Sequence, residues 1–445
     1  MSWNTEKTVS FDFGSGWVDL SSLVRNDLTY TTRSMNEDFH YAQNEALLHI
    51  AYDETYYEDF LDTSVDILVK IESGTPLVAE FTGHIPPSRR RRYDGLIDNV
   101  VIELEAIDYT DYLAKQIGDV AWENCKVQDP ADTSHSLVHL VFTAIGLDTA
   151  YIDSSVTIST EVRVATSGAD DEEALFFLDT LLYEYGYVAH WNGAGKFSPV
   201  RWILATGATT TYDFTESNIA LSVEVEEEES EHYEGTDLIW FEVGERENTL
   251  IYRESLPFND DGSFAGYDIP AGYYYPPETN VADPVTGTDQ VVYQEYTDDA
   301  IRYFTNKAIV NNLDYNYKAF TSDFSDILKT SAHRLDWDAE AGITLDPDPA
   351  TFENKRAIVR FLNGEASAKK IYYANIYATV LYRTTERKYR IERVASTKKL
   401  YGYASRFVFV AANAEALTQG IDKAFELSNT YYRFSSSDGL PRFGR

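Results

Sequence analysis

Cysteine is nearly absent from this chain of 445 residues, which has one, Cys125, and methionine occurs only twice. A single cysteine cannot form a disulfide within the chain, so the fold needs no oxidising compartment. No cysteine–histidine arrangement is recognisable around Cys125. We therefore interpret it as a buried or half-buried small residue rather than a nucleophile.

Long apolar runs are also missing. No stretch approaches the roughly 18 apolar residues of a membrane-spanning helix, and the N-terminus has no basic region followed by an apolar run. The sequence predicts neither a membrane span nor a signal peptide. A chain of this kind would leave a cell by lysis or as part of a particle.

Basic residues are scarce: 37 lysines and arginines face 73 aspartates and glutamates, which gives a formal net charge of -36. Specific binding to nucleic acid is excluded as a main activity, because a protein that follows phosphates needs a basic face. An acidic wall that lies close to DNA without holding it is compatible with this charge. Solubility or a salty habitat explains the charge equally well.

Catalytic and cofactor motifs are absent. There is no Gly-x-Ser-x-Gly sequence, phosphate-binding loop or dinucleotide fingerprint. His135 and His139 have the spacing of a two-histidine metal site on a helix, but without a third ligand we favour a surface or interface pair. The acidic run 224–231 lacks the spacing of a calcium loop and favours a solvated strand or turn. We expect no cofactor, no metal and no enzymatic activity.

Aromatic residues are abundant, with 33 tyrosines and an aromatic content of 14%. Tyrosine favours strands and large contact surfaces, because its flat apolar ring ends in one polar group. Exposed rings also stack on sugars, so a carbohydrate-binding adhesin is an alternative. The tryptophans that motivate it are Trp3, Trp17, Trp191 and Trp240. A cell-wall hydrolase is a third hypothesis, with no specific motif behind it.

The length predicts two to four domains, and the hydrophobic pattern divides the chain. Residues 1–116 alternate as strands do, most clearly at 100–107, and predict a β-barrel or sandwich. Residues 117–205 predict a small α/β unit. Residues 206–255 return to strands, and residues 256–445 form a second β-rich region. The fold class is therefore β-rich α+β.

Helices and turns inside these regions have clear boundaries. Apolar spacing predicts helices over residues 132–146 and 170–185, and a further helix over 413–428 near the end. An Asn-Gly-type turn at 192–195 predicts a hairpin directly after the second helix. Residues 257–290, rich in proline and glycine, predict a long loop.

Four consecutive arginines form the one basic cluster of this acidic chain. They follow a proline pair and precede a strand, so they occupy a hairpin loop or the start of a strand. A solvated loop is one interpretation and a contact with DNA is a smaller one. The functional interpretation is a subunit interface, because a guanidinium group can form two hydrogen bonds with one carboxylate and a second copy of the chain supplies many carboxylates. The candidate interface residues are Arg89, Arg90, Arg91 and Arg92.

The order of segments resembles the hub proteins of tailed-phage baseplates and tail tips, which are related to the hub part of type VI secretion spikes. The resemblance lies in FTGHI at 81–85, then strand 100–107 followed by DYTDYL at 108–113, then helix and hairpin over 170–197. The stretch STKKLYGY at 396–403 and helix 413–428 are similar to the closing segment of such hubs.

The resemblance implies two tail-tube-like β-barrels, with 117–205 as an inserted α/β domain and 256–445 as the second barrel region. It implies a homotrimeric ring that caps the tail tube around a lumen for DNA or a tape-measure protein. Implied partners are the tail tube or distal tail protein, the tape-measure protein, and tail-tip, spike or fibre proteins. The implied location is the virion, after synthesis in the host cytoplasm. No lysozyme or peptidase segment is recognisable, so we expect a separate protein as the tip.

Overall fold

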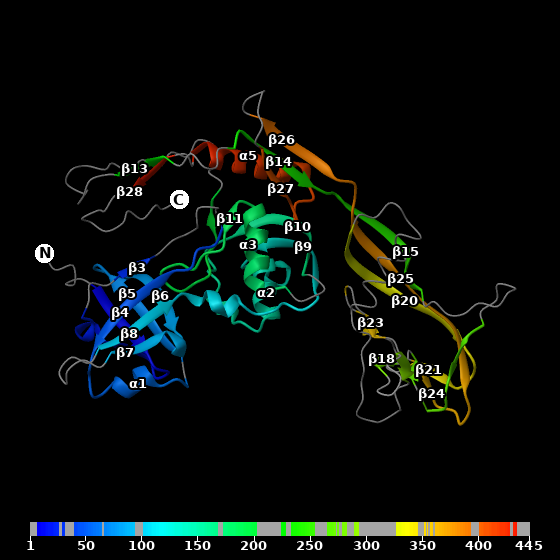
Figure 1. Ribbon diagram of the computed structural model, residues 1–445. Coiled ribbons are helices and arrows are strands. Elements are labelled where there is room, and N and C mark those ends of the chain that lie inside the picture. Colours follow the sequence, from blue (N-terminus) through cyan, green and yellow to red (C-terminus); the bar gives the residue numbers. More distant parts are fainter. Residues whose placement is uncertain are drawn as a thin grey trace.

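The computed structural model is β-rich with few helices, which confirms the predicted class at that level (Figure 1). The residues it describes are 7–25, 29–31, 40–64, 66–93, 101–167, 172–202, 224–227, 233–253, 265–272, 274–275, 278–282, 289–292, 326–345, 351–352, 354, 357–358, 361–392, 400–427 and 430–433. Trp3 and residues 228–231 of the acidic run lie outside them.

The N-terminal region forms a curled antiparallel sheet in the order β2-β1-β5-β6-β8-β4-β3, with β7 paired to β8. Along β8, alternate residues are buried because they point to the concave core, which confirms the alternation predicted for 100–107. The short helix α1 (Tyr57–Leu61) adds Phe60 to this core. The strands are β1 (Lys7–Asp12), β2 (Trp17–Asp19), β3 (Thr29–Thr31), β4 (Glu45–Ala51), β5 (Ile67–Ser73), β6 (Val78–Ile85), β7 (Arg90–Tyr93) and β8 (Val101–Ile107).

The next region packs two helices on a two-stranded sheet and a hairpin (Figure 1). Gly186, at a φ of 83°, ends the second helix as predicted. The predicted hairpin is confirmed by the bridge between Trp191 and Phe197. We call this region the α/β unit; its elements are β9 (Ala121–Gln128), α2 (Leu137–Ala144), β10 (Ile158–Thr166), α3 (Ala174–Glu184), β11 (Tyr187–Val188) and β12 (Val200–Arg201).

Two helix starts were predicted too early. A separate 3-10 turn, Thr133–His135, precedes α2, and Ser136 rather than an earlier residue holds the N-cap position. The reason is tertiary, because the Ser136 hydroxyl accepts the amide of Asp129 at 3.0 Å and fixes an extended backbone there. In α3, Glu173 is the N-cap, so Glu172 and Glu173 precede the first helical residue.

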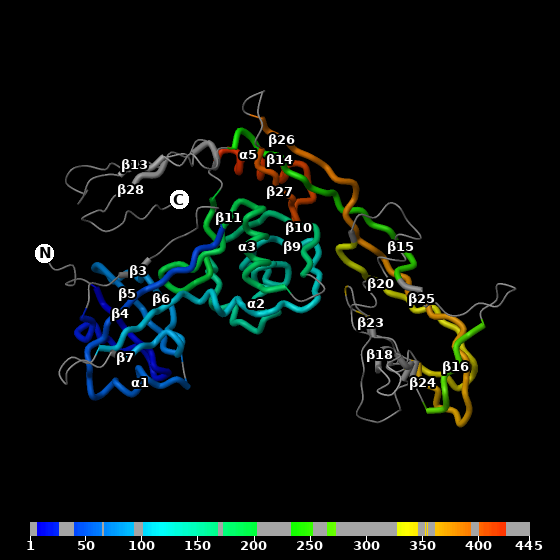
Figure 2. The backbone as a smooth tube through the Cα atoms, viewed as in Figure 1, coloured from blue at the N-terminus to red at the C-terminus, as the bar shows by residue number. Residues whose placement is uncertain are grey.

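A long antiparallel ribbon leaves the α/β unit (Figure 2). One side is β14 (Gly235–Trp240) followed by β15 (Val243–Arg253), and the other is β25 (Lys369–Arg383) followed by β26 (Arg387–Glu392). The strand β20 (Asp326–Ala339) pairs with the other edge of β25. Next to β14 lie β27 (Tyr401–Ala404) and helix α5 (Ala411–Leu427), close to the predicted helix 413–428.

The predicted long loop 257–290 is partly wrong. It contains β16 (Tyr267–Ile269), β17 (Tyr274–Tyr275), β18 (Glu278–Ala282) and the start of β19 (Asp289–Val292). Local composition missed β16 and β17 because they pair with strands about a hundred positions further along the chain, β25 and β24 (Phe361–Asn363). The other short strands are β13 (Glu224–Glu227), β21 (Ile343–Leu345), β22 (Thr351–Phe352), β23 (Ala357–Ile358) and β28 (Thr430–Arg433).

The curled sheet and the α/β unit are joined by close backbone contacts. The Thr82 hydroxyl of β6 donates to the carbonyl of Gly193 at 2.7 Å, and the side-chain amide of Asn44 donates to the carbonyl of Trp191 at 3.2 Å. A side chain at Gly193 would collide with the backbone of Ala79 and Glu80. Glycine therefore permits the hairpin tip to lie directly on β6.

Candidate functional site

The arginine run, Arg89 to Arg92, lies where the sequence placed it, at the start of a strand. Arg89 ends the 3-10 turn Pro87–Arg89 and the other three belong to β7. Strand β7 pairs with β8, so successive arginines point to opposite faces of the curled sheet.

Arg89 and Arg90 bind groups of the same chain. Arg89 forms an ion pair with Glu105 and lies 3.8 Å from Glu45. Arg90 donates to the carbonyl of Ile85 from Nε at 3.1 Å and from Nη2 at 2.8 Å, and also to the carbonyl of Asp62. Burial lowers the pKa of Arg90, and the carboxylates of Asp66 and Asp62 oppose that effect. These two arginines therefore stabilise the curled sheet itself.

Arg91 and Arg92 are exposed. The Arg91 side chain is 64% exposed and lies 3.4 Å from Glu103, which also contacts His49 at 3.2 Å. The Arg92 guanidinium lies over the ring of Tyr57, 5.3 Å from its centroid, and Tyr57 packs on the exposed Tyr52. Arginine beside tyrosine is the composition of many protein–protein contact sites.

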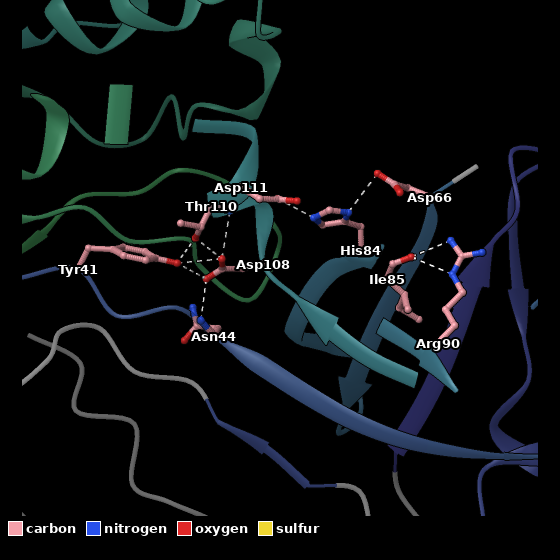
Figure 3. A network of polar contacts seen from close by, with 9 residues as sticks. All are labelled: Tyr41, Asn44, Asp66, His84, Ile85, Arg90, Asp108, Thr110 and Asp111. Atoms are coloured by element: carbon pink, nitrogen blue, oxygen red, sulfur yellow. Dashed lines mark hydrogen bonds and ion pairs between the residues drawn. The ribbon is translucent and has the colours of Figure 1, made fainter. Parts of the chain in front are cut away.

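A buried polar junction lies where β8 leaves the curled sheet (Figure 3). Asp108 caps the 3-10 turn η4 (Tyr109–Leu113) by accepting the amide of Thr110 at 3.2 Å. Its carboxylate also accepts hydrogen bonds from the Tyr41 hydroxyl at 2.9 Å and from the backbone N–H of Asn44 at 2.8 Å. Burial raises the pKa of Asp108, and these hydrogen bonds oppose the rise. This junction explains why an aspartate follows the strand in the stretch 108–113.

His84 of β6 is fully buried beside the same turn (Figure 3). Its Nε2 lies 2.7 Å from Asp111 Oδ1, and its Nδ1 lies 3.3 Å from Asp66 Oδ2 without hydrogen-bond geometry. The rings of Tyr109 and Tyr112 pack on the imidazole at centroid distances of 5.8 and 4.8 Å. One imidazole thus contacts carboxylates from two different segments.

A second buried carboxylate, Glu184, ties α3 to the segment before α5. It accepts the backbone amides of Arg406 and Phe407, each at 2.6 Å, as well as the hydroxyls of Ser405 at 2.8 Å and Tyr403 at 3.2 Å. Burial raises the pKa of Glu184, and the same hydrogen bonds oppose the rise. The contact holds segment 403–407 on the α/β unit.

Arg406 and Phe407 complete this attachment. The Arg406 guanidinium forms a forked ion pair with Glu172, with 2.5 Å between Nη2 and Oε2. Phe407 is buried in the core of the α/β unit, with its ring 5.2 Å from that of Phe177. A segment more than 200 positions away therefore supplies part of that core.

The histidine pair of the sequence does not form a pair in the structure. His135 is exposed in the 3-10 turn and contacts Asp132, whereas His139 is buried in α2. The Ser136 hydroxyl lies 2.7 Å from His139 Nδ1, but Ser136 is fully buried and its oxygen accepts a backbone amide, so it cannot reach a substrate. Among the described residues, no group of three or more potential ligands is arranged to hold a metal ion.

The structure also bears on the predictions for Cys125, for the tryptophans and for a membrane span. Cys125 is buried, as predicted. Trp191 and Trp240 are buried too, which removes two of the four rings that motivated the adhesin hypothesis; Trp17 remains 43% exposed. Within the described part of the chain, no helix has the length and apolar character needed to cross a membrane.

The sequence analysis missed Glu184 and His84 as key residues. A signal existed for Glu184, because Phe177 and Leu181 place it on an apolar stripe of α3, where a carboxylate needs partners. For His84 there was no comparable signal, since its two carboxylates come from positions that only the folded chain brings together.

No protein-family model matches the chain, and no curated protein sequence is similar to it. Among solved structures, the fold is similar to the 43 kDa tail protein of prophage MuSo2 from Shewanella oneidensis, at 11% identity and a TM-score of 0.35 over 52% of this chain and 65% of that one. It is also similar to a tail protein from Neisseria meningitidis MC58, at 12% identity and a TM-score of 0.34 over 52% of this chain and 64% of that one.

A further neighbour is a PdpA–VgrG complex, at 12% identity and a TM-score of 0.30 over 44% of this chain and 34% of that one. The chain spans less than two thirds of each neighbour. The first two of these neighbours are tail proteins, and the third is a VgrG complex.

Proposed function

We propose that the chain is a structural hub subunit of a phage-type tail, and not an enzyme. Three copies form a ring that caps the tail tube, joins it to the tail tip or baseplate and surrounds a lumen for DNA or a tape-measure protein. In this proposal the curled sheet and the β-rich region 256–445 are the two tube-like barrel parts, with the α/β unit inserted between them.

The observation that carries the proposal is the openness of the curled sheet. Its two end strands, β2 and β3, each have one neighbouring strand among the described residues. Open strand edges add strands from neighbouring chains unless they are protected, so a closed ring of copies is a natural completion. The arginine run supports the same function, because it places exposed guanidinium groups on this sheet within a strongly acidic chain.

The test is the mass and shape of the purified protein, measured by native mass spectrometry and electron microscopy with and without a tail tube protein. We expect trimers that form rings and bind the end of the tube. A stable monomer that never joins the tube would contradict the proposal.

Changing all four arginines to serine should impair assembly more than folding. Arg89 and Arg90 also have contacts within the chain, however, so their loss would lower the stability of the subunit as well as its assembly. Arg91→Ser is the cleaner variant. We expect it to weaken trimer formation about fivefold while the unfolding free energy changes by less than about 0.5 kcal/mol, because an exposed ion pair contributes little to folding. Analytical ultracentrifugation and urea unfolding measure the two effects.

Arg387→Ser is the matched control. The Arg387 side chain is 56% exposed and lies 3.3 Å from Glu242, much as Arg91 lies 3.4 Å from Glu103, but it belongs to β26. Equal effects of the two substitutions on assembly would show that the arginine run is not a specific interface.

A further inference from the structure

The strands β15 and β20 flank β25 in a sheet that we call the arm, which runs away from the α/β unit (Figure 1). Near the start of the arm, one row of paired residues across the three strands contacts β9 and β10 of that unit. The row consists of Glu245, 3.7 Å from Arg163, Lys329, 3.0 Å from Glu123, and Leu381, which shares a buried apolar cluster with Val164. This row fixes the near end of the arm to the α/β unit.

Both outer strands of the arm carry a β-bulge directly beyond this row. The pairing with β25 shifts between residues 246 and 249 of β15 and between residues 331 and 334 of β20. Each bulge places two residues of an outer strand opposite one residue of β25, and these β25 residues are the neighbours Thr379 and Ala378. A bulge interrupts the hydrogen-bonded ladder and bends its strand. Here both sides of the ladder are interrupted at one level, while β25 continues through it.

Each bulge contains a non-glycine residue in the left-handed region. Asn248 and Ala332 both have a φ of 48°, a conformation that asparagine tolerates and that is unfavourable for alanine. The conformation of Ala332 is therefore held by its surroundings. Beside it, Nε2 of His333 lies 2.9 Å from the Thr330 hydroxyl, and the ring of His333 stacks on that of Phe352 at a centroid distance of 5.0 Å.

The side chain of Arg334 joins the two bulges across the central strand. Its guanidinium lies over the ring of Tyr377 in β25, 4.6 Å from the centroid, and Nη2 donates to Oδ1 of Asn248 in β15 at 3.3 Å. Arg334 and Asn248 are both exposed. Exposed contacts of this kind contribute little to stability, so thermal motion readily breaks them.

We propose that the paired bulges form a hinge, at which the far part of the arm changes its angle to the α/β unit, and that Arg334 holds the angle seen in this structure. The far part moves as one body because it has its own apolar core, which includes Ile251, Phe361 and Ile371. Ala378 and Val380 belong to the same core, so β25 bends at the hinge without breaking. The inference concerns a single subunit and does not depend on the proposed hub function.

The experiment measures the distance between two spin labels on the full chain by pulsed electron paramagnetic resonance. One label is attached through Ser159→Cys in the α/β unit and the other through Ala366→Cys beyond the hinge, both at exposed positions. Cys125→Ala removes the native thiol from every sample. The control pair, Ser159→Cys with Thr385→Cys, lies on the near side of the hinge. We expect the distance distribution across the hinge to be about twofold wider than that of the control pair.

Arg334→Ala should widen the distribution across the hinge further, again about twofold, and leave the control pair unchanged. Arg387→Ala is the matched control variant, since Arg387 is an exposed arginine of β26 with a contact to Glu242 at 3.3 Å, and it should change neither distribution. Deleting Ala332 together with Asn248 removes the extra residue from each bulge. Pairing with β25 then becomes regular, and the distribution across the hinge should narrow to that of the control pair.

A wild-type distribution across the hinge as narrow as that of the control pair would overturn the inference. So would a distribution that both Arg334→Ala and the double deletion leave unchanged. Equal widening by Arg334→Ala and Arg387→Ala would show that Arg334 does not hold the hinge.

Discussion

Replacing Glu184 by alanine is expected to lower the free energy of unfolding by about 4 kcal/mol. The substitution leaves the amides of Arg406 and Phe407 buried without an acceptor, and each unsatisfied buried donor costs about 1–3 kcal/mol. It also opens space beside the core that Phe407 completes. Urea unfolding measures the loss, and faster hydrogen exchange at the two amides would locate it at segment 403–407.

The control is Glu415→Ala, an exposed helical glutamate of α5 that accepts from Gln419 at 3.1 Å. It should change the unfolding free energy by less than about 0.5 kcal/mol. A similar small effect of Glu184→Ala would show that segment 403–407 is held by its apolar contacts alone.

The protonation of Glu184 makes a separate prediction about pH. Burial, together with its place at the C-terminal end of α3, disfavours the carboxylate, and burial raises its pKa in the folded chain above the ordinary value of 4.5. As pH rises above that value, the unfolded chain releases the proton first, so folding loses stability until the folded pKa is passed. Glu184→Gln cannot ionise, so we expect its stability relative to wild type to improve as pH rises through this window. Parallel urea titrations across pH test this, and a constant difference would contradict it.

Gly83→Ala is expected to lower the free energy of unfolding by about 3 kcal/mol, because overpacking against backbone cannot relax by a rotamer change. A β-carbon at Gly83 would collide with the carbonyl of Ile107 where β6 approaches β8 at the pair His84 and Ile107. Thermal and urea unfolding measure the loss. The substitution should also disturb the contact of His84 with Asp111, since β6 must move.

The matched control is Gly402→Ala in β27, where an added β-carbon meets nothing within 4 Å. Both glycines lie in strands at ordinary backbone angles, Gly83 buried and Gly402 exposed, so the comparison separates the effect of close packing from that of strand preference. Equal losses would show that the general strand preference, not the close approach of β6 to β8, explains the effect of Gly83→Ala.

Local patterns in the sequence predicted most elements that depend on near neighbours. The alternation at 100–107, the stop at Gly186 and the hairpin turn at 192–195 are all present, because periodicity and turn chemistry act over a few residues. Helix starts were less accurate, since Ser136 takes its position from a hydrogen bond to the backbone of Asp129.

The residues of the candidate site were likewise predictable only in part. The sequence alone determined that the chain is β-rich, strongly acidic and marked by one basic cluster, since composition and short-range periodicity do not depend on the fold. Only the tertiary structure decided that Arg89 and Arg90 are engaged while Arg91 and Arg92 are exposed, and that Glu184 meets segment 403–407. The physical reason is that a buried charge needs partners, and in a folded chain those partners come from positions that no local pattern connects.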